Sequence, residues 1–319
     1  MKKFLIIIIN LVLIFLFLIL CDYVVYHFEN SENKPDDFKY AYKVDTRKIL
    51  EDEFYKVERN LRHLKDTGFR ISSEEYNPNL PSIIIFGCSF AYGYELNDNQ
   101  TFAYKLQELT QRLVINRGIC SWGINHMLYQ LNREDIMESL KFNLANKNNK
   151  IPEVHDIIYI FMQDHIRRLY IPCCFYDSNI WTYKLDKKKK KLVSKTDFDD
   201  FYWHSYTLRS IYRSIMFKYS YKMTKRTQEL LYYHFKESYD MVKKKFPNAK
   251  FTIFVYNGED EISTIRQELE NYGINIIYLS ELSDKDFGQE EYVVDDCAHP
   301  SEKAWSEIAP LIVNKLNLL

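Results

Sequence analysis

Apolar positions alternate along most of the chain between short continuous runs and longer stretches with helical spacing. The short runs are rich in Ile, Val, Phe and Tyr, which is typical of strands buried on both faces of a parallel sheet. They occupy residues 82–86, 113–116, 156–162, 251–256 and 274–278. The stretches with helical spacing occupy residues 101–111, 124–140, 263–272 and 301–316. This alternation predicts an α/β fold with a mostly parallel sheet that helices cover on both faces.

The alternation is interrupted over residues 169–248. Within this interval, residues 181–193 have the pattern of a hairpin, and their turn is the lysine run 187–191. Two stretches with helical spacing follow, at residues 206–221 and 225–246. We interpret the interval as a helical and hairpin insertion. The lysine run is interpreted as a solvated loop tip, and contact with an anionic membrane or polymer is the alternative.

The N-terminal residues 4–20 form an apolar run that only Asn10 interrupts, and two lysines precede it. A run of about 17 residues is at the lower limit for a helix that crosses a bilayer. A cleaved signal peptide needs small residues before its cut site, and a lipoprotein signal needs a small residue before its cysteine. The end of this run has no small pair, and the residue before Cys21 is large, so an uncleaved helix fits the sequence better than cleavage or lipidation. We therefore predict an uncleaved transmembrane signal-anchor over residues 1–21. By the positive-inside rule, the lysines place the N-terminus in the cytoplasm and the bulk of the chain outside it, as a single-pass membrane protein.

Composition narrows the class of protein. The chain has 319 residues, with 43 Lys+Arg against 44 Asp+Glu. Because nucleic-acid-binding domains usually carry a basic surplus, this balance argues against a nucleic-acid partner. The polar residues 22–80, which include a helical pattern at 46–64, are predicted to form a stalk or packing arm that leads to a domain over residues 81–319.

The six cysteines include no C-x-x-C pair, so their spacing predicts no zinc site. Cys88, Cys120 and Cys297 each fall near a polar segment that follows or precedes a predicted element. A disulfide between two of them would suit an exported protein. The equally open alternative is that these cysteines are small, buried apolar residues that form no disulfide.

Polar segments follow the first three predicted strands, at residues 87–93, 116–123 and 163–168, and a fourth segment at 295–300 precedes the last helix. In an open parallel sheet, binding sites lie at the carboxyl ends of the strands. We therefore expect these segments to meet in one crevice.

Ser89 lies at a predicted strand-to-helix turn, where its hydroxyl is exposed and its N–H favours negative charge. An alcohol is a poor nucleophile at neutral pH unless a neighbouring group takes its proton. His299 has the chemistry for this, and Asp296 for holding the ring in the correct tautomer. Asp295 is the alternative acid. The alternatives without a catalytic role are that Ser89 only caps the next helix and that His299 is a surface loop residue.

The segments resemble the conserved blocks of the SGNH hydrolase (GDSL-like esterase) superfamily. Gly87-Cys88-Ser89 resembles its Gly-Asp-Ser-type nucleophile motif, and residues 296–300 resemble its Asp-x-x-His-Pro block. Residues 116–123 resemble its Asn-x-Gly block. The resemblance covers residues 81–319 apart from the insertion at 169–248.

The resemblance implies a flavodoxin-like three-layer sandwich with a five-stranded sheet. It also implies a catalytic triad of Ser89, His299 and Asp296, with no metal and no organic cofactor. The oxyanion hole would consist of the N–H groups of Ser89 and Ser121 and the side-chain amide of Gln163.

Three positions depart from the family pattern. Ser121 stands where the family has a glycine, Gln163 stands where it has an asparagine, and Cys88 replaces the usual aspartate. A backbone N–H survives the first change, whereas Gln163 is one methylene longer than asparagine. One misplaced oxyanion donor costs about 2.7–4 kcal/mol of transition-state stabilisation.

Asp164, His165 and Arg167, with Arg168, follow the third predicted strand. We interpret them as candidate substrate-binding residues that could shape the pocket or bind an anionic sugar. Structural ion pairs at the strand end are the alternative.

The sequence thus predicts a serine esterase that removes O-acyl groups, for example acetyl, through an acyl-enzyme. An extracytoplasmic cell-envelope polysaccharide is the expected class of substrate, and the membrane is the expected partner of the N-terminal helix. The alternatives are an O-acyltransferase that uses the same triad with a sugar acceptor, and a non-catalytic envelope scaffold with this fold.

Overall fold

The computed structural model describes most of the chain beyond residue 68 and a short N-terminal helix. The described residues are 16–24, 69–70, 72–120, 122–144, 150–170, 182–195, 223–294 and 299–319.

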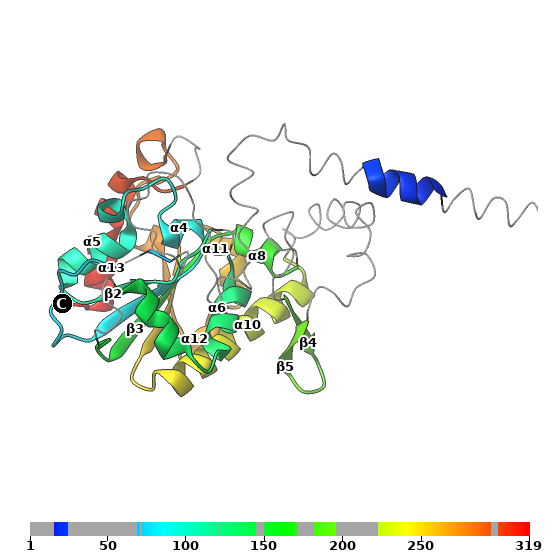
Figure 1. Ribbon diagram of the computed structural model, residues 1–319, viewed down its shortest axis with the longest axis horizontal. Helices are drawn as coiled ribbons and strands as arrows, with labels where there is room; N and C mark the ends of the chain where they lie inside the picture. The colour runs from blue at the N-terminus through cyan, green and yellow to red at the C-terminus, as the bar shows by residue number, and fades with distance from the viewer. Residues whose placement is uncertain are drawn as a thin grey trace, which may run out of the picture.

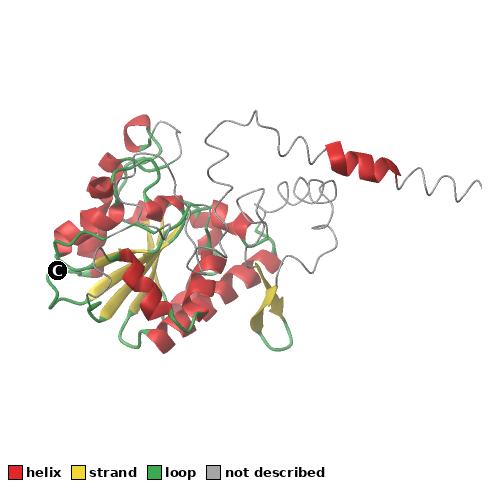
Figure 2. Ribbon diagram, viewed as in Figure 1, coloured by secondary structure: helices red, strands yellow, loops and turns green. Residues whose placement is uncertain are grey.

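Five parallel strands form the centre of the α/β domain (Figure 1, Figure 2). They are β1 (Ser82–Phe86), β2 (Val114–Asn116), β3 (Val154–Phe161), β6 (Lys250–Val255) and β7 (Asn275–Tyr278). Their order in the sheet is β2-β1-β3-β6-β7, and each adjacent pair is parallel. This is the flavodoxin-like order, in which the crossover direction reverses between β1 and β3. The predicted parallel sheet is therefore confirmed.

Alternate residues of each strand face opposite helix layers. In β1, Ile84 and Phe86 belong to one buried cluster, and Ile83 and Ile85 belong to the other. Because successive side chains of a strand point to opposite faces, this sorting follows directly from the apolar run.

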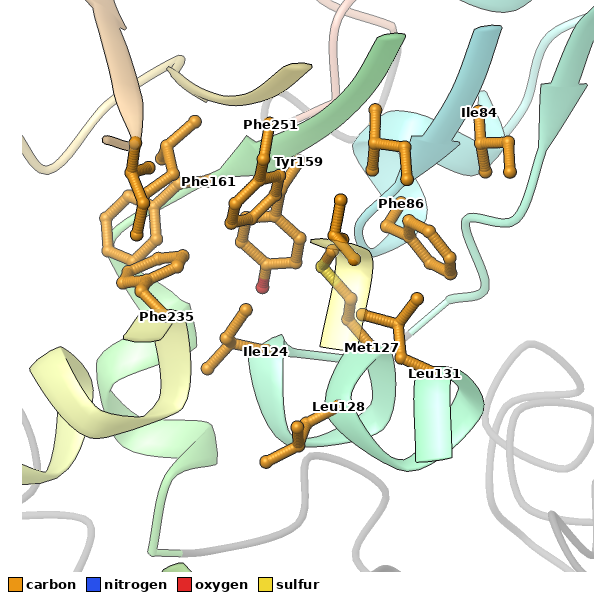
Figure 3. Close-up of a cluster of buried hydrophobic side chains, with 14 of the residues drawn as sticks. Ile84, Phe86, Ile124, Met127, Leu128, Leu131, Tyr159, Phe161, Phe235 and Phe251 are labelled. Carbon is orange, nitrogen blue, oxygen red and sulfur yellow. The ribbon is translucent and has the colours of Figure 1, made fainter. Parts of the chain in front are cut away.

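The first layer lies against Ile84 and Phe86, and Figure 3 shows part of its apolar core. It contains α6 (Ile124–Asn132), α7 (Ile136–Leu140), α10 (Lys225–Lys245), α11 (Glu259–Ser263) and α12 (Arg266–Asn271). The opposite layer contains α4 (Ser89–Tyr92), α5 (Phe102–Thr110) and α13 (Glu302–Leu316). The domain thus has helices on both faces of its sheet.

Helix α10 is an integral part of the first layer, although its sequence lies within the predicted insertion. The Phe235 ring packs against the rings of Tyr159 and Phe161 on β3, at centroid distances of 5.7 and 6.2 Å. The hairpin of β4 (Thr182–Asp186) and β5 (Lys191–Lys195) forms a separate two-stranded sheet, with the predicted turn between its strands. The predicted helix at 206–221 lies outside the described residues.

Two predicted helices have other bounds in the structure. The stretch 124–140 forms α6 and α7, because Arg133 takes an extended conformation (φ −62°, ψ 138°) that ends α6. An ion pair from Arg133 to Asp135 holds this break. The stretch 263–272 is helical only over α12, because the separate helix α11 ends at Ser263, where the predicted helix was expected to begin. By contrast, α13 begins as predicted, with the Ser301 side chain accepting a hydrogen bond from the Ala304 N–H.

At the N-terminus, residues 16–24 are helical, and large apolar side chains there, from Leu16 to Leu20, are exposed. Within the described part of the chain, no helix has the length and apolar character needed to cross a membrane. Residues 1–15 of the predicted signal-anchor and the helical pattern at 46–64 lie outside the described residues. The anchor therefore stays a prediction.

Replacing Phe235 by alanine tests the place of α10 in the core. Because the ring is fully buried, Phe235→Ala should lower the free energy of unfolding by about 3–5 kcal/mol. Lys244→Ala, on an exposed position of the same helix, should change it by no more than about 0.5 kcal/mol. Urea denaturation measures both values, and equal effects of the two substitutions would contradict the assignment of α10 to the core.

Candidate active site

Ser89 is the first residue of α4, directly beyond the carboxyl end of β1. The turn between them needs Gly87, whose φ is +153° and whose added Cβ would lie 2.8 Å from the Cβ of Ala91. This close approach places the first turn of α4 tightly against the strand. Ser89 is largely buried, with 7% of its surface exposed, but it reaches the pocket described below.

His299 is held by a closed loop just before α13. Val293 and Pro300 form an antiparallel bridge, and the Val294 N–H donates to the His299 carbonyl at 2.9 Å. The cap at Ser301 then starts the helix. The backbone of His299 and Pro300 is therefore bound to that of Val293 and Val294, which limits the movement of the imidazole.

The structure brings Ser89 and His299 together, although 210 positions separate them in the sequence: the His299 Nε2 lies 2.7 Å from the Ser89 Oγ. The rings of Phe90 and Tyr94 lie beside the imidazole, at centroid distances of 5.3 and 4.7 Å. The contact expected between serine and histidine is thus present.

Two other predicted participants cannot be placed. Asp296 lies in residues 295–298, together with the alternative acid Asp295 and Cys297, and these four residues are outside the described part of the chain. Ser121 is outside it as well. Their roles stay predictions. Cys88 is a buried free thiol whose Sγ lies 3.3 Å from the Met162 Sδ, so it forms no disulfide.

Residues of the second polar segment pack beneath α4. The Asn116 side-chain amide donates to the Ala91 carbonyl at 2.8 Å, and its oxygen accepts from the Gly118 N–H at 3.0 Å. A Cβ on Gly118 would lie 2.6 Å from both the Ala91 Cβ and the Tyr92 nitrogen. The Asn-x-Gly pattern thus has a local physical cause, because the loop and the helix of Ser89 touch through their backbones.

The structure gives Gln163 other partners than those expected for an oxyanion donor. Its Nε2 donates to the Glu261 Oε1 at 2.7 Å, and its backbone N–H donates to the Asn257 Oδ1 at 2.8 Å. Gln163 does not line the pocket of Ser89, whereas Asn257 does. The Asn257 oxygen is occupied by this bond, which leaves its NH₂ group as the donor.

Asp164 and the two arginines after it form ion pairs. Its carboxylate accepts two hydrogen bonds from Arg167, both at 2.7 Å, and one from the Arg168 Nε at 2.8 Å. Arg168 also donates to the Trp122 carbonyl at 2.6 Å. Asp164 and Arg168 line the pocket but Arg167 does not. This arrangement corresponds to the alternative of structural ion pairs at the strand end.

His165 points into the core below α8 (Asp164–Arg168) and does not line the pocket. Its Nδ1 lies 2.8 Å from the Tyr159 hydroxyl, and the residue is fully buried. Burial, with nearby Arg168 as the second cause, lowers the pKa of His165 well below its usual value. A buried neutral imidazole of this kind has a structural place rather than a contact with substrate.

Around Ser89 and His299 lies a pocket of about 770 Å³. Its wall includes Phe90 from the first expected segment, and also residues that the sequence reasoning missed, namely Met162, Tyr256, Asn257 and positions between 279 and 288. Several of these directly follow β6 and β7, so the strand-end argument used for the other segments could have found them. Burial, and secondarily the charge of Asp286, raises the pKa of Tyr256 above its usual value, so this hydroxyl stays protonated.

The charges on the pocket wall are uneven. Among the described residues of the wall, the cationic side chains are Arg168, which shares the Asp164 carboxylate with Arg167, and Lys285, which donates to Glu307 at 2.6 Å. Further carboxylates on the wall come from Glu259, Asp284 and Asp286. The pocket therefore favours a neutral or cationic ligand over an anionic one.

Within the described residues, no group of three or more His, Cys, Asp or Glu side chains is arranged to hold a metal ion. The arrangement provides a hydroxyl on the first residue of a helix and an imidazole in contact with it. This combination is suited to nucleophilic attack on an acyl carbonyl.

No protein-family model matches the chain, and no curated protein does. Solved structures with partial similarity include a protein described as lipolytic and of the G-D-S-L family from Desulfitobacterium hafniense DCB-2, with 11% identity and a TM-score of 0.40. The match covers 75% of this chain and 99% of that one.

An acetyl xylan esterase from the rumen bacterium Butyrivibrio proteoclasticus has 12% identity and a TM-score of 0.41, over 75% of this chain and 64% of that one. A family two carbohydrate esterase from Clostridium thermocellum, solved with cellohexaose, has 12% identity and a TM-score of 0.38, over 76% and 66% of the two chains. Similarity this distant leaves the function to be argued from the geometry of the site.

A fluorophosphonate probe tests the reactivity of Ser89. Since His299 contacts the hydroxyl, the wild-type chain should be labelled and Ser89→Ala should not be. His299→Ala should slow labelling by about 10²–10⁴-fold, the usual contribution of a general base. Mass spectrometry of the labelled peptide measures the site and rate.

Ser280→Ala is the matched control, because Ser280 also lines the pocket but donates to Glu259. It should be labelled at the wild-type rate. A wild-type chain that remains unlabelled, or a label that survives in Ser89→Ala, would remove Ser89 from the reaction.

Proposed function

We propose that this protein is an SGNH-type serine esterase that removes O-acyl groups from an extracytoplasmic substrate such as a cell-envelope polysaccharide. The 2.7 Å contact between the His299 Nε2 and the Ser89 Oγ is the observation that carries the proposal. Its position at the carboxyl ends of a parallel sheet, beside a pocket, supports the same conclusion.

In the proposed reaction, the Ser89 Oγ attacks the acyl carbonyl while the His299 Nε2 takes the hydroxyl proton. The tetrahedral intermediate collapses to an acyl-enzyme, and the imidazolium returns the proton to the departing alcohol. Water, deprotonated by the same imidazole, then attacks the acyl-enzyme. The imidazolium returns this proton to the Ser89 Oγ as the bond to the acyl group breaks, and the acid is released. Asp296, in the closed loop before His299, holds the ring tautomer in this proposal.

The proposed oxyanion donors are the N–H groups of Ser89 and Ser121 together with a side-chain amide. Asn257 fits the third role better than Gln163, because it lines the pocket and its oxygen is fixed by the Gln163 N–H. The Gln163 amide would first have to leave Glu261.

Charge and location support the proposed class of substrate. The uncompensated carboxylates of the pocket wall disfavour an acylated polyanion, so a neutral or amine-bearing sugar is the expected alcohol. The exposed apolar side chains of residues 16–24 support the proposal that a signal-anchor over residues 1–21 holds the domain at a membrane.

Acetyl-ester substrates test the proposed activity in the full-length chain, purified in mild detergent. Wild type should release acetate from an acetylated neutral oligosaccharide, and Ser89→Ala should not. An acetylated uronate oligomer should be cleaved with a lower kcat/KM, because its carboxylates face those of the pocket. Acetate release measured by ion chromatography gives both values.

A parallel reaction contains the same donor and a deacetylated oligosaccharide acceptor. Free acetate should remain the main product. Acetyl transfer to the acceptor that outpaces acetate release would replace the hydrolase with an O-acyltransferase. If the wild-type chain shows neither activity and is not labelled by the fluorophosphonate, the remaining interpretation is a non-catalytic scaffold with this fold.

Two amide substitutions separate the candidate oxyanion donors. Asn257→Asp keeps an oxygen to accept from the Gln163 N–H but removes the NH₂ donor, so kcat should fall by about 10²–10³-fold. Gln163→Ala removes only an amide already bound to Glu261, and kcat should change by less than about 3-fold. Steady-state kinetics on 4-nitrophenyl acetate measures both, and the reverse pattern would return the role to Gln163.

A further inference from the structure

We propose that Phe69 and Arg70, which precede the first strand, are positioning residues that hold Ser89 and His299 in register. This inference rests on the proposed esterase function. Both residues come from the predicted stalk or packing arm (residues 22–80), outside the strand–helix alternation that builds the site, and both are buried on the domain.

Arg70 fixes the turn that directly follows α4. Its Nη2 donates to the Gly93 carbonyl and to the Leu96 carbonyl, both at 2.7 Å. Its Nη1 forms an ion pair with Asp98. The side chain is 5% exposed, so these bonds are shielded from water. One guanidinium thus joins three points of the segment from Gly93 to Asp98.

This turn contacts both members of the reactive pair. The N–H groups of Gly93 and Tyr94 donate to the Ser89 carbonyl, at 2.9 and 3.0 Å. The Tyr94 ring lies 4.7 Å from the His299 ring, centroid to centroid. A shift of the turn would therefore move the nucleophile through its backbone and the base through the ring beside it.

Phe69 holds the loop on the other side of α4. Its ring lies 3.5 Å from the guanidinium carbon of Arg117 and meets the Trp122 ring edge-on at 6.4 Å. Together with Ile119, Phe69 and Trp122 form a small apolar cluster of their own. Ser121, the predicted second oxyanion donor, lies in the chain between these contacts.

A buried amide links the backbone of the arm to the same loop. The Asn143 Nδ2 donates to the Arg70 carbonyl at 2.9 Å and to the Asn116 carbonyl at 2.7 Å. Asn116 in turn donates to the Ala91 carbonyl within α4. The Arg70 side chain therefore contacts the turn after α4, and the Arg70 main chain is connected to α4 separately, through Asn143 and Asn116.

Helix α4 needs such support because it has only four residues, and Cys88 gives it no side-chain cap. A single helical turn does not repay the entropy of its own nucleation, so its surroundings must impose its geometry. Reacting groups misplaced by about 1 Å can lose about 10²-fold in rate. The arm therefore acts on the reaction by restraining α4, the turn after it and the second polar segment.

Substitutions of Arg70 in the full-length chain test this inference. Arg70→Met removes all three bonds and should lower kcat on 4-nitrophenyl acetate by about 10- to 100-fold, with KM changed less than about 3-fold. The rate of fluorophosphonate labelling should fall by the same factor. Arg70→Lys, which keeps the charge opposite Asp98, should recover part of the loss. Circular dichroism at the assay temperature checks that each variant is folded.

Ser72→Ala is the matched control. It removes a hydrogen bond of 2.6 Å from the same arm to the Val114 carbonyl but does not touch the turn after α4, so kcat should stay within about 2-fold of wild type. A folded Arg70→Met variant with wild-type kcat and labelling would overturn the inference. So would a loss in Ser72→Ala that matches the loss in Arg70→Met. A wild-type chain that is neither labelled nor active would instead overturn the proposed function, and the inference with it.

Discussion

The hydrogen bond between the Ser89 hydroxyl and the His299 imidazole is the interaction on which the proposed function depends. It joins the end of the first strand to a loop near the C-terminus, across 210 positions of sequence. No local preference can make such a contact, so the sheet, the layer of α5 and α13 and the closed loop before α13 must all be correct at once. The parallel sheet is what makes this possible, because it brings the carboxyl ends of distant strands to one edge.

Support for this contact comes from side chains that never touch a substrate. Gly87 and Gly118 let backbone approach backbone around α4, and Asn116 ties the second polar segment to the same helix. Arg70 and Phe69 add restraints from a segment that precedes the sheet. Helix α4 is thus too short to be stable by itself, and contacts with neighbouring residues restrain its geometry.

Much of the fold could be predicted from the sequence, because strands buried on both faces leave continuous apolar runs and their parallel direction follows from the alternation with helices. The flavodoxin-like strand order was implied only by the resemblance to the SGNH superfamily. Ser89 and His299 could be predicted because each lies in a short motif beside an element boundary. The place of α10 was harder to foresee, since its polar surface is broad and its buried stripe, with Leu231 and Phe235, becomes evident only against β3. The partners of Gln163 are tertiary, because Asn257 lies in the loop after β6 and Glu261 lies in α11. Asp164 instead binds two arginines on its own short helix. Spacing in the sequence does not encode such choices between competing partners.

The sorting of alternate β1 side chains between the two helix layers also limits how this chain can change in evolution. Deleting or inserting one residue between Ile83 and Phe86 would exchange the faces of the later β1 positions and shift the turn that carries Ser89 relative to His299. The turn of the β4–β5 hairpin bears no such constraint, since it stands outside the main sheet. Related chains should therefore vary in length at the hairpin while the interval from Ser82 to Ser89 keeps its length, even where its residues differ.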